Sequence, residues 1–218
     1  MKFTNVLFDL DGTLTDPAVG ITRCYRHALI ALGRDAPPAD TLLWLIGPPV
    51  RKNFRDLLGT EDPALIERAV SLYRERYARE GLYENAAYPG VEAMLADLRA
   101  AGLRLFVATS KLARFIAPIL EHFRLAQFFS GLYGSALDST LDDKADLLAH
   151  LIAAERLDPA ATLMVGDREH DIFAAHRNRV RALGITYGFG TRAELAAAGA
   201  DFIRDTPAEV ATLIREQT

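Results

Sequence analysis

The sequence predicts an α/β fold, in which a parallel sheet carries helices on both faces and a small all-helical cap subdomain follows the first strand. Two observations predict it. Short apolar segments alternate with helical patterns along most of the chain, which is typical of a parallel sheet covered on both faces. The stretch from about 17 to 87 interrupts this alternation with helical patterns alone. Ligands in open parallel sheets bind beyond the carboxyl ends of the strands, so the loops after the strands are the expected site.

Each expected strand is a short run of apolar or β-branched residues bounded by polar or turn-forming residues. The expected strands are 4–8, 103–108, 161–165 and 180–185, with weaker patterns at 128–132 and 201–203. The helices expected between and after them are 90–101, 112–123, 142–156, 170–177 and 207–216. This alternation indicates a Rossmann-like core.

The inserted stretch contains helical patterns punctuated by proline and glycine. The expected helices are 17–32, 39–46, 50–58 and 63–80, and the connectors are 14–16 and 86–90. We therefore expect a core domain formed by 1–15 and 88–218, and a cap formed by 16–87.

Composition narrows the class of function. The 218 residues are 50% hydrophobic and 25% charged, which is the balance of an ordinary globular protein. The formal net charge of −4 lacks the basic footprint of a general nucleic-acid binder. The single cysteine, Cys24, excludes an intrachain disulfide framework, and we expect it to be buried on a helix. We see no secretory signal and no apolar stretch near the ~18 residues of a membrane span, so we expect a cytoplasmic location.

Two acidic residues follow the first expected strand, in the segment 9–13 (DLDGT). Asp9 and Asp11 can share one small space, where like charges are unfavourable unless a cation or a proton relieves them. Gly12 permits a sharp turn, and backbone N–H groups in such a turn can hold phosphate oxygens. A turn that merely closes a strand is the alternative. The position directly after an apolar strand favours a functional role.

A second acidic loop ends the strand expected at 161–165, in the segment 165–171 (VGDREHD). Asp167 and Asp171 can share one face of a helical turn, although acidic residues there are also common helix caps. Acidic loops at two strand ends suggest a hard-cation site, and Mg²⁺ is typically held by one or two carboxylates plus substrate phosphate. His170 is no evidence for zinc, because no second histidine or cysteine stands at ligand spacing.

Two weaker signals lie between these loops. Thr109, Ser110 and Lys111 follow the strand expected at 103–108, where a hydroxyl beside a helix N-terminus can bind an anion or act as an ordinary cap. Lys144 lies near a helix start, where a cation is unfavourable with respect to the helix dipole. A solvated surface lysine is the alternative. Both signals gain meaning from their order along the chain.

The ordered set of segments 9–13 and 109–111, Lys144 and segment 166–171 resembles the four motifs of the haloacid dehalogenase-like hydrolases. The helical insertion before the segment 88–91 (YPGV) resembles the subfamily with a small helical cap, and phosphoglycolate phosphatase-like members look most similar. The resemblance covers essentially the whole chain. The acid at position 11 favours phosphoryl chemistry over carbon–halogen cleavage, since dehalogenase members lack it.

The resemblance assigns a role to each matching residue. Asp9 would be the nucleophile that forms an aspartyl-phosphate, and Asp11 the general acid/base, whose backbone carbonyl also binds the metal. Asp9 and Asp167 would be metal ligands, and Asp171 would order the metal site directly or through water. Lys144 would neutralise charge on the nucleophile and the phosphoryl group.

Groups next to these motifs are expected to contact the substrate. The resemblance places a phosphoryl oxygen on the Thr109 hydroxyl. The other expected substrate-binding residues of the core are Gly12, Thr13, Ser110 and Lys111.

The cap is expected to decide the substrate, because caps of this type close over the site and exclude water. Arg51 follows a rigid turn at 46–49 (IGPP) and could hold a substrate carboxylate or a second phosphate, or be a solvated helix arginine. Arg23, Trp44 and Lys52 are the other cap residues to test, although Trp44 fits the cap core better than a stacking platform. The run 187–190 (YGFG) is interpreted as structural.

The leading interpretation is a Mg²⁺-dependent phosphatase of a small phosphomonoester, with phosphoglycolate as the substrate that the resemblance suggests. A 5′-nucleotide or a sugar phosphate is nearly as consistent. A phosphomutase similar to β-phosphoglucomutase would return the phosphoryl group from Asp9 to another hydroxyl. A non-catalytic binding protein is disfavoured, because each position that the chemistry needs holds the required residue type. We expect a small phosphorylated metabolite as partner, no nucleic acid, no membrane, and a monomer or homodimer.

Overall fold

A computed structural model describes residues 2–136 and 140–217 of the chain. Contacts divide the chain into two compact units. One, which we call the core, comprises Met1–Asp16 and Ala87–Thr218, and the other, which we call the cap, comprises Pro17–Ala86. These boundaries lie one residue from those expected.

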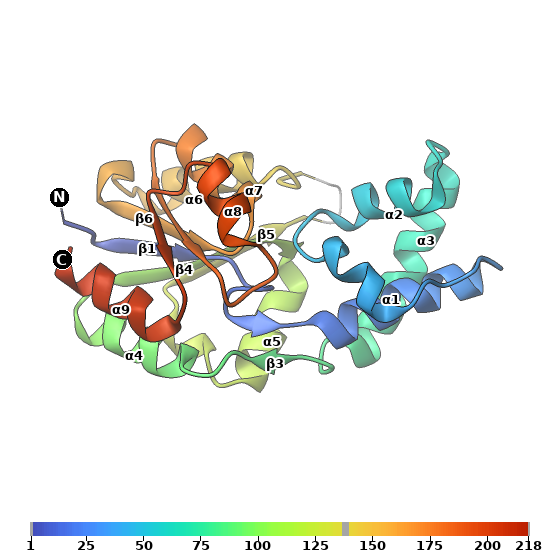
Figure 1. Cartoon of the computed structure of the whole chain (residues 1–218), viewed down its shortest axis with the longest axis horizontal. Coiled ribbons are helices and arrows are strands. Elements are labelled where there is room, and N and C mark those ends of the chain that lie inside the picture. Colours follow the sequence, from blue (N-terminus) through green and yellow to red (C-terminus); the bar gives the residue numbers. More distant parts are fainter. Residues whose placement is uncertain (1, 137–139, 218) are drawn as a thin grey trace. The chain divides into compact units, whose positions relative to one another are not determined.

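The core is built on a six-stranded sheet in which every neighbouring pair is parallel (Figure 1). The strand order is β5-β4-β1-β6-β7-β8. The strands are β1 Asn5–Phe8, β4 Arg104–Leu112, β5 Gly131–Ser135, β6 Thr162–Gly166, β7 Arg181–Ile185 and β8 Phe202–Arg204. Because β1 lies between β4 and β6, the loops that follow these three strands meet at one edge of the sheet.

Helices cover both faces of this sheet, as predicted. Helices α4 and α9 pack against each other on one face, and α6 and α7 pack together on the other (Figure 1). The core helices are α4 Val91–Ala100, α5 Ile116–His122, α6 Lys144–Glu155, α7 Glu169–Arg177, α8 Arg192–Ala197 and α9 Pro207–Glu216. Side chains of the central strands, such as Leu7, Phe106 and Met164, pack fully buried with helix residues Leu148 and Ile172. Apolar side chains on both faces explain why the central strands have continuous apolar sequences.

The structure corrects the helix expected at 112–123. Strand β4 continues to Leu112, a 3-10 turn follows at Ala113–Phe115, and α5 begins only at Ile116. A start at 112 would place Pro118 in the helix interior, where proline removes a backbone hydrogen bond and clashes with the preceding turn. With the start at Ile116, Pro118 falls in the first turn, where it is tolerated. Thr109 therefore stands inside a strand and caps no helix.

The strand expected at 128–132 is also displaced. A 3-10 turn occupies Ala126–Phe128, and the strand is Gly131–Ser135. This is an edge strand with two glycines, so its pairing with β4 fixes its place and its own apolar pattern does not. Helix α8 was not predicted at all, although Thr191 caps it by accepting a hydrogen bond from the Glu194 backbone N–H at 3.1 Å.

The described cap residues form helices. They are α1 Ala18–Ala31, the 3-10 helix Ala39–Leu45, α2 Val50–Leu58, α3 Pro63–Arg76 and a π-helical turn at Tyr77–Gly81. Two-residue strands, β2 Thr15–Asp16 and β3 Ala86–Ala87, pair with each other at the two connections.

Aromatic packing stabilises the cap interior. The Tyr25 ring lies 5.0 Å from that of Phe54 and 4.7 Å from that of Tyr73, measured between centroids. Asn53 donates to the Tyr25 hydroxyl at 2.7 Å. Cys24 is fully buried on α1, as predicted. Trp44 is 45% exposed, so the expectation that it belongs to the cap core is wrong.

None of the helices in the described ranges combines the length and the apolar character that crossing a bilayer requires.

Candidate active site

Asp9 is the first residue after β1, and neighbouring elements hold it from several sides. Its backbone N–H continues the sheet by donating to the Val165 carbonyl at 2.9 Å. Its Oδ1 accepts the Leu10 backbone N–H at 2.8 Å, and its Oδ2 lies 3.0 Å from Nζ of Lys144. The residue is only 4% exposed. Asp9 therefore has a fixed carboxylate at the carboxyl edge of the central strand.

The turn after Asp9 carries Asp11, Gly12 and Thr13. Gly12 has a φ of +86°, and a Cβ atom there would lie 2.2 Å from Oδ2 of Asp167. Only glycine permits this approach. The Thr13 hydroxyl is buried and donates to Oδ1 of Asp167 at 3.3 Å. The turn thus packs its backbone directly against the carboxylate of the second acidic loop.

Asp167 follows β6 and is fully buried. Its Oδ2 accepts the backbone N–H of Phe189 at 2.8 Å. Phe189 lies in the run 187–190, which was interpreted as structural, and this contact makes the run part of the site. A Cβ on Gly188 would lie 2.5 Å from Cβ of Asp167, and one on Gly190 would lie 1.8 Å from the Asp167 carbonyl oxygen. The two glycines let the loop fold against the carboxylate, a role that a pair of glycines after a strand could have signalled.

Asp171 is the third residue of α7. Its Oδ2 accepts the Arg168 backbone N–H at 3.1 Å, which caps the helix. Gly166 makes room for it, because a Cβ there would lie 2.1 Å from the carboxyl carbon of Asp171. The capping role and the site role expected for this residue are therefore compatible.

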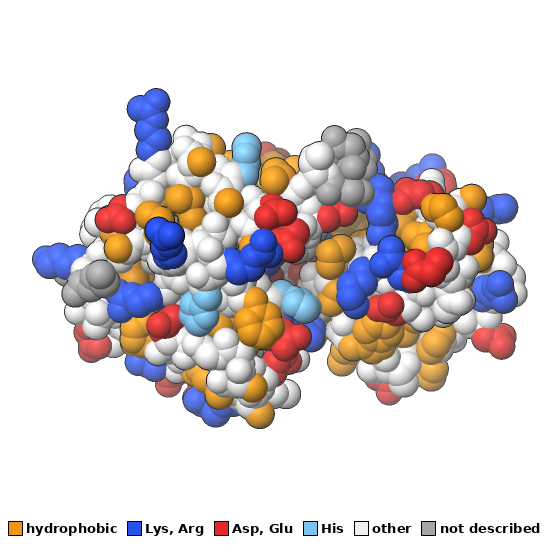
Figure 2. Space-filling model, turned by 90° about the horizontal axis from the view of Figure 1, so that it is seen from above, with side chains coloured by type: hydrophobic (Ala, Val, Ile, Leu, Met, Phe, Trp, Pro, Cys, Tyr) orange, Lys and Arg blue, Asp and Glu red, His pale blue; other side chains and the backbone are white. Residues whose placement is uncertain are grey.

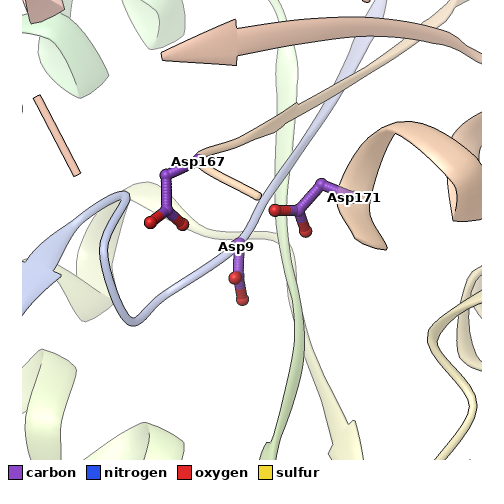
Figure 3. A group of neighbouring side chains, drawn as sticks. All are labelled: Asp9, Asp167 and Asp171. Atoms are coloured by element: carbon purple, nitrogen blue, oxygen red, sulfur yellow. The ribbon is translucent and has the colours of Figure 1, made fainter. Parts of the chain in front are cut away.

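The carboxylates of Asp9, Asp167 and Asp171 turn toward a common space (Figure 3). One oxygen of each lies within 4.8 Å of the others, and all three residues are buried. Asp9 is far from Asp167 and Asp171 in the sequence, and the sheet brings them together because β1 and β6 are neighbours.

Lys144, the first residue of α6, brings a positive charge to this group. Its Nζ contacts Oδ2 of Asp9 at 3.0 Å and Oδ1 of Asp171 at short ion-pair distance. Lys144 is 9% exposed, so it is not a solvated surface lysine. Burial lowers the pKa of its ammonium, but the charges of Asp171 and Asp9 outweigh that effect and hold the pKa above its ordinary value.

Burial dominates the electrostatics of the carboxylates. It raises the pKa of Asp167 well above the ordinary value, and the charges of Asp171 and Asp9 raise it further. Burial raises the pKa of Asp171 to about 6, although Lys144 opposes the shift. Both shifts show that the ionised carboxylates are unfavourable here, since they are buried and three of them lie near a single ammonium.

A divalent cation would supply further positive charge. Mg²⁺ prefers oxygen ligands, and the facing carboxylate oxygens of Asp9, Asp167 and Asp171 provide them at close range. The residues present therefore fit a magnesium site, which agrees with the expectation from the sequence.

Asp11 stands apart from this group. Its side chain pairs with Lys111, with 2.7 Å between Nζ and Oδ2. Burial raises the pKa of Asp11, and the Lys111 ammonium opposes this shift. Thr109 is buried within β4, where its Oγ1 accepts the Lys111 backbone N–H at 3.3 Å. Ser110, between them, is half-buried.

Comparison with known proteins agrees with this geometry. Residues 6–185 match the family described as haloacid dehalogenase-like hydrolase. The chain belongs to this family. A 5′-nucleotidase of Pseudomonas aeruginosa is 44% identical over 197 residues, covering 90% of this chain and 89% of that protein. A phosphoglycolate phosphatase of Nitrosospira multiformis is 31% identical over 220 residues, covering 98% and 96%.

One more similar protein and one solved structure support the same fold. The tyrosine-protein kinase PtkA of Mycobacterium tuberculosis is 39% identical over 207 residues, covering 95% of this chain and 67% of that protein. The crystal structure of a predicted phosphatase from Clostridium acetobutylicum has a TM-score of 0.95 and 37% identity, covering 99% of this chain and all of that one. This haloacid dehalogenase-like hydrolase thus shares its complete two-unit fold with a solved relative.

The cap residues singled out in this hydrolase make ion pairs within the cap. Arg51 contacts Glu67 on α3 through Nε at 2.5 Å and through a second guanidinium nitrogen at 3.2 Å. Arg23 pairs with Glu84 at 2.6 Å. Lys52 pairs with Asp56 one helical turn away at 3.0 Å. A role for Arg51 in substrate binding stays a prediction.

Proposed function

We propose that this chain is a Mg²⁺-dependent phosphatase that hydrolyses a small phosphomonoester through an aspartyl-phosphate on Asp9. One observation carries the proposal: a buried carboxylate, Asp9, stands at the carboxyl end of the central strand between an ammonium and two further carboxylates. A carboxylate that attacks a phosphate dianion needs positive charge nearby. In this arrangement the ammonium supplies one charge, and the carboxylates fit a cation that would supply more. Membership of the hydrolase family supports the same reaction class.

In the first half of the reaction, an oxygen of Asp9 attacks phosphorus. The bond from phosphorus to the leaving oxygen breaks, and Asp11 gives that oxygen a proton. The ammonium of Lys144 stays beside Asp9 and offsets the repulsion between the nucleophile and the phosphoryl group. The Thr109 hydroxyl on β4 is the proposed donor to a phosphoryl oxygen.

In the second half, water attacks the phosphorus of the aspartyl-phosphate. Asp11, now ionised, takes a proton from the water, the bond between Asp9 and phosphorus breaks, and inorganic phosphate leaves. Asp11 changes from acid to base and Asp9 from nucleophile to leaving group, so both residues end the cycle in their starting form.

Asp9, Asp167 and Asp171 would hold the magnesium ion, which when bound supplies positive charge that orients the phosphoryl group. The Phe189 N–H and the Thr13 hydroxyl hold Asp167 in place for this purpose. Ligands fixed by such hydrogen bonds are a common feature of metal sites.

Two substrate classes have support. The 44% identity to a protein named 5′-nucleotidase favours a nucleoside monophosphate. The relatives named phosphoglycolate phosphatase, at 31–32% identity, favour the smaller ester that the sequence suggested. The nucleotide is the better supported of the two, since its relative is the more similar.

A small phosphorylated metabolite is the proposed partner. Basic and acidic side chains are interspersed on the face drawn in Figure 2, without a continuous basic stripe. A nucleic-acid partner would favour such a stripe.

The test is phosphate release by the purified protein with Mg²⁺ across a panel of esters: 5′-nucleotides, phosphoglycolate and sugar phosphates. We expect release that stops with EDTA and is absent in Asp9→Asn. The panel's best substrate names the class. Phosphate release that survives EDTA would contradict the metal dependence. No release from any ester, or phosphate transfer that requires a bisphosphate, would replace the proposal with a binding protein or a mutase.

A further inference from the structure

Strand β4 is longer than its neighbour β1 at the edge where the site lies. The last residue of β1, Phe8, pairs with Val107, and β4 continues to Leu112. Its pairing with β5 changes register between Thr109 and Leu112. Such an irregularity bends the strand and re-aims a side chain, and bulges of this kind are common beside active sites. Ser110 and Lys111 lie within this irregular stretch of β4.

Two contacts fix the bulge. A Cβ on Gly134 would lie 2.5 Å from the Lys111 carbonyl oxygen, so the glycine on β5 permits a close approach of the two backbones. The Lys111 backbone N–H donates to the Thr109 hydroxyl oxygen at 3.3 Å. The Lys111 side chain therefore extends from a backbone that is held on both sides.

The Lys111 ammonium forms an ion pair with one oxygen of Asp11. Nζ lies 2.7 Å from Oδ2, with the two side chains 6% and 11% exposed. The other oxygen, Oδ1, is buried and has no hydrogen-bond partner among the residues that the structure describes. A buried acceptor without a partner is costly unless a ligand or water supplies one. The pair thus holds one oxygen of the carboxyl and leaves the second to react.

We propose that Lys111 is a positioning residue that holds Oδ2 of Asp11 and so makes Oδ1 the oxygen that exchanges protons during catalysis. The inference rests on the proposed function. The proton on Oδ1 goes to the leaving oxygen as its bond to phosphorus breaks. Oδ1 then takes a proton from water as the new bond to phosphorus forms and the bond to Asp9 breaks.

A different role for Lys111, direct binding of substrate phosphate, makes the opposite kinetic prediction. A binding lysine acts independently of Asp11, so its loss should raise KM and multiply with the loss of Asp11. A positioning lysine acts only through Asp11, so its removal should lower kcat. This effect on kcat should disappear once Asp11 no longer exchanges protons. Residues that act as a unit show this non-additivity.

The experiment is a double-mutant cycle with p-nitrophenyl phosphate as substrate and Mg²⁺ present. It compares wild type, Lys111→Met, Asp11→Asn and the double variant. We expect Lys111→Met to lower kcat by about 30-fold, a part of the 10²–10⁴-fold that acid–base catalysis contributes, with KM little changed. In the Asp11→Asn background the same substitution should change kcat by less than about threefold.

Arg104→Met is the matched control. Arg104 stands on the same strand and pairs with Glu155 at 2.5 Å, away from the site and 45% exposed. Its loss should leave kcat within about twofold of wild type, since exposed ion pairs contribute little.

Several results would overturn the inference. Losses that multiply across the cycle, or a raised KM with unchanged kcat, would make Lys111 a substrate-binding residue. If Lys111→Met fails to fold because Asp11 is left as an unpaired buried charge, the double variant, which lacks both charges, still decides. Its kcat should lie within about threefold of that of Asp11→Asn, and a larger deficit would contradict the positioning role. A wild type that hydrolyses no ester would instead refute the proposed function, and this inference with it.

Discussion

Replacing Lys144 with methionine should strongly destabilise the metal-free protein. The Lys144 ammonium contacts Asp9 and Asp171, and all three residues are at most 9% exposed. Removing one partner of a buried ion pair costs about 3–5 kcal/mol, because the remaining charge stays buried without compensation. For a chain of this size each kcal/mol lowers the melting temperature by roughly 2–4 °C, so a fall of about 6–20 °C is expected.

The loss should depend on pH, and its sign follows from Asp171. Burial raises the pKa of Asp171 to about 6 from 3.8, and removing Lys144 raises it further. A carboxyl whose pKa is raised by folding does not reduce the free energy of unfolding below its unfolded pKa. The reduction grows as the pH rises toward the folded pKa. One proton on Asp171 replaces the charge that Lys144 supplied. Wild type carries the cost of burying Asp171 up to its own pKa of about 6, so the deficit of the variant is small near pH 5, grows above pH 6 and is largest near pH 8.

The assay is thermal unfolding followed by circular dichroism in EDTA at the two pH values. Lys52→Met is the control, because Lys52 forms an exposed pair with Asp56 one helical turn away. Its loss should cost about 0.3–0.5 kcal/mol at either pH. The reasoning would be refuted if Lys144→Met melted within about 2 °C of wild type near pH 8, or if its deficit were equal at both pH values.

Three further outcomes are expected. Asp9→Asn should abolish phosphate release while its melting temperature stays within about 4 °C of wild type, since the amide oxygen can still accept the Leu10 N–H; retained turnover would remove Asp9 as nucleophile. Arg51→Ala should raise KM for the best ester of the panel more than for p-nitrophenyl phosphate, whereas equal effects would make Arg51, which pairs with Glu67, part of the scaffold. Gly190→Ala should cost about 1–3 kcal/mol and weaken Mg²⁺ binding measured by calorimetry, because its Cβ would meet the Asp167 carbonyl at 1.8 Å; unchanged Mg²⁺ affinity would show that the loop does not position this ligand.

The central part of the fold could be predicted because its signal is local. Strands β1, β6 and β7 are buried on both faces, and their continuous apolar runs place them within one residue of the expected positions. The edge strand β5 could not be placed this way, since Gly131 and Gly134 carry no apolar pattern and β4 sets the register. Helix α8 had a readable signal in the spacing of Thr191 and Glu194, which is the spacing of a capping box.

The acidic residues of the site could be found because each lies in a short motif after a strand. The contacts that orient them could not. The Phe189 donor is a backbone N–H, which has no signature of its own in a sequence, and it reaches Asp167 from 22 residues away. The partner of Lys111 depends on how far β4 runs beyond β1, which is decided by pairing across the sheet.

The way Asp167 is enclosed also has a consequence for the order in which the protein matures. The carboxylate is held by Thr13, which is made early, and by Phe189, which is made near the end, so its hydrogen bonds span most of the chain. A nascent chain released from the ribosome only as far as β6 would carry Asp9 but lack both Asp167 and Asp171, which follow that strand. It would also lack the Phe189 backbone that orients Asp167. Tight binding of the proposed magnesium ion would therefore begin only after Phe189 has emerged.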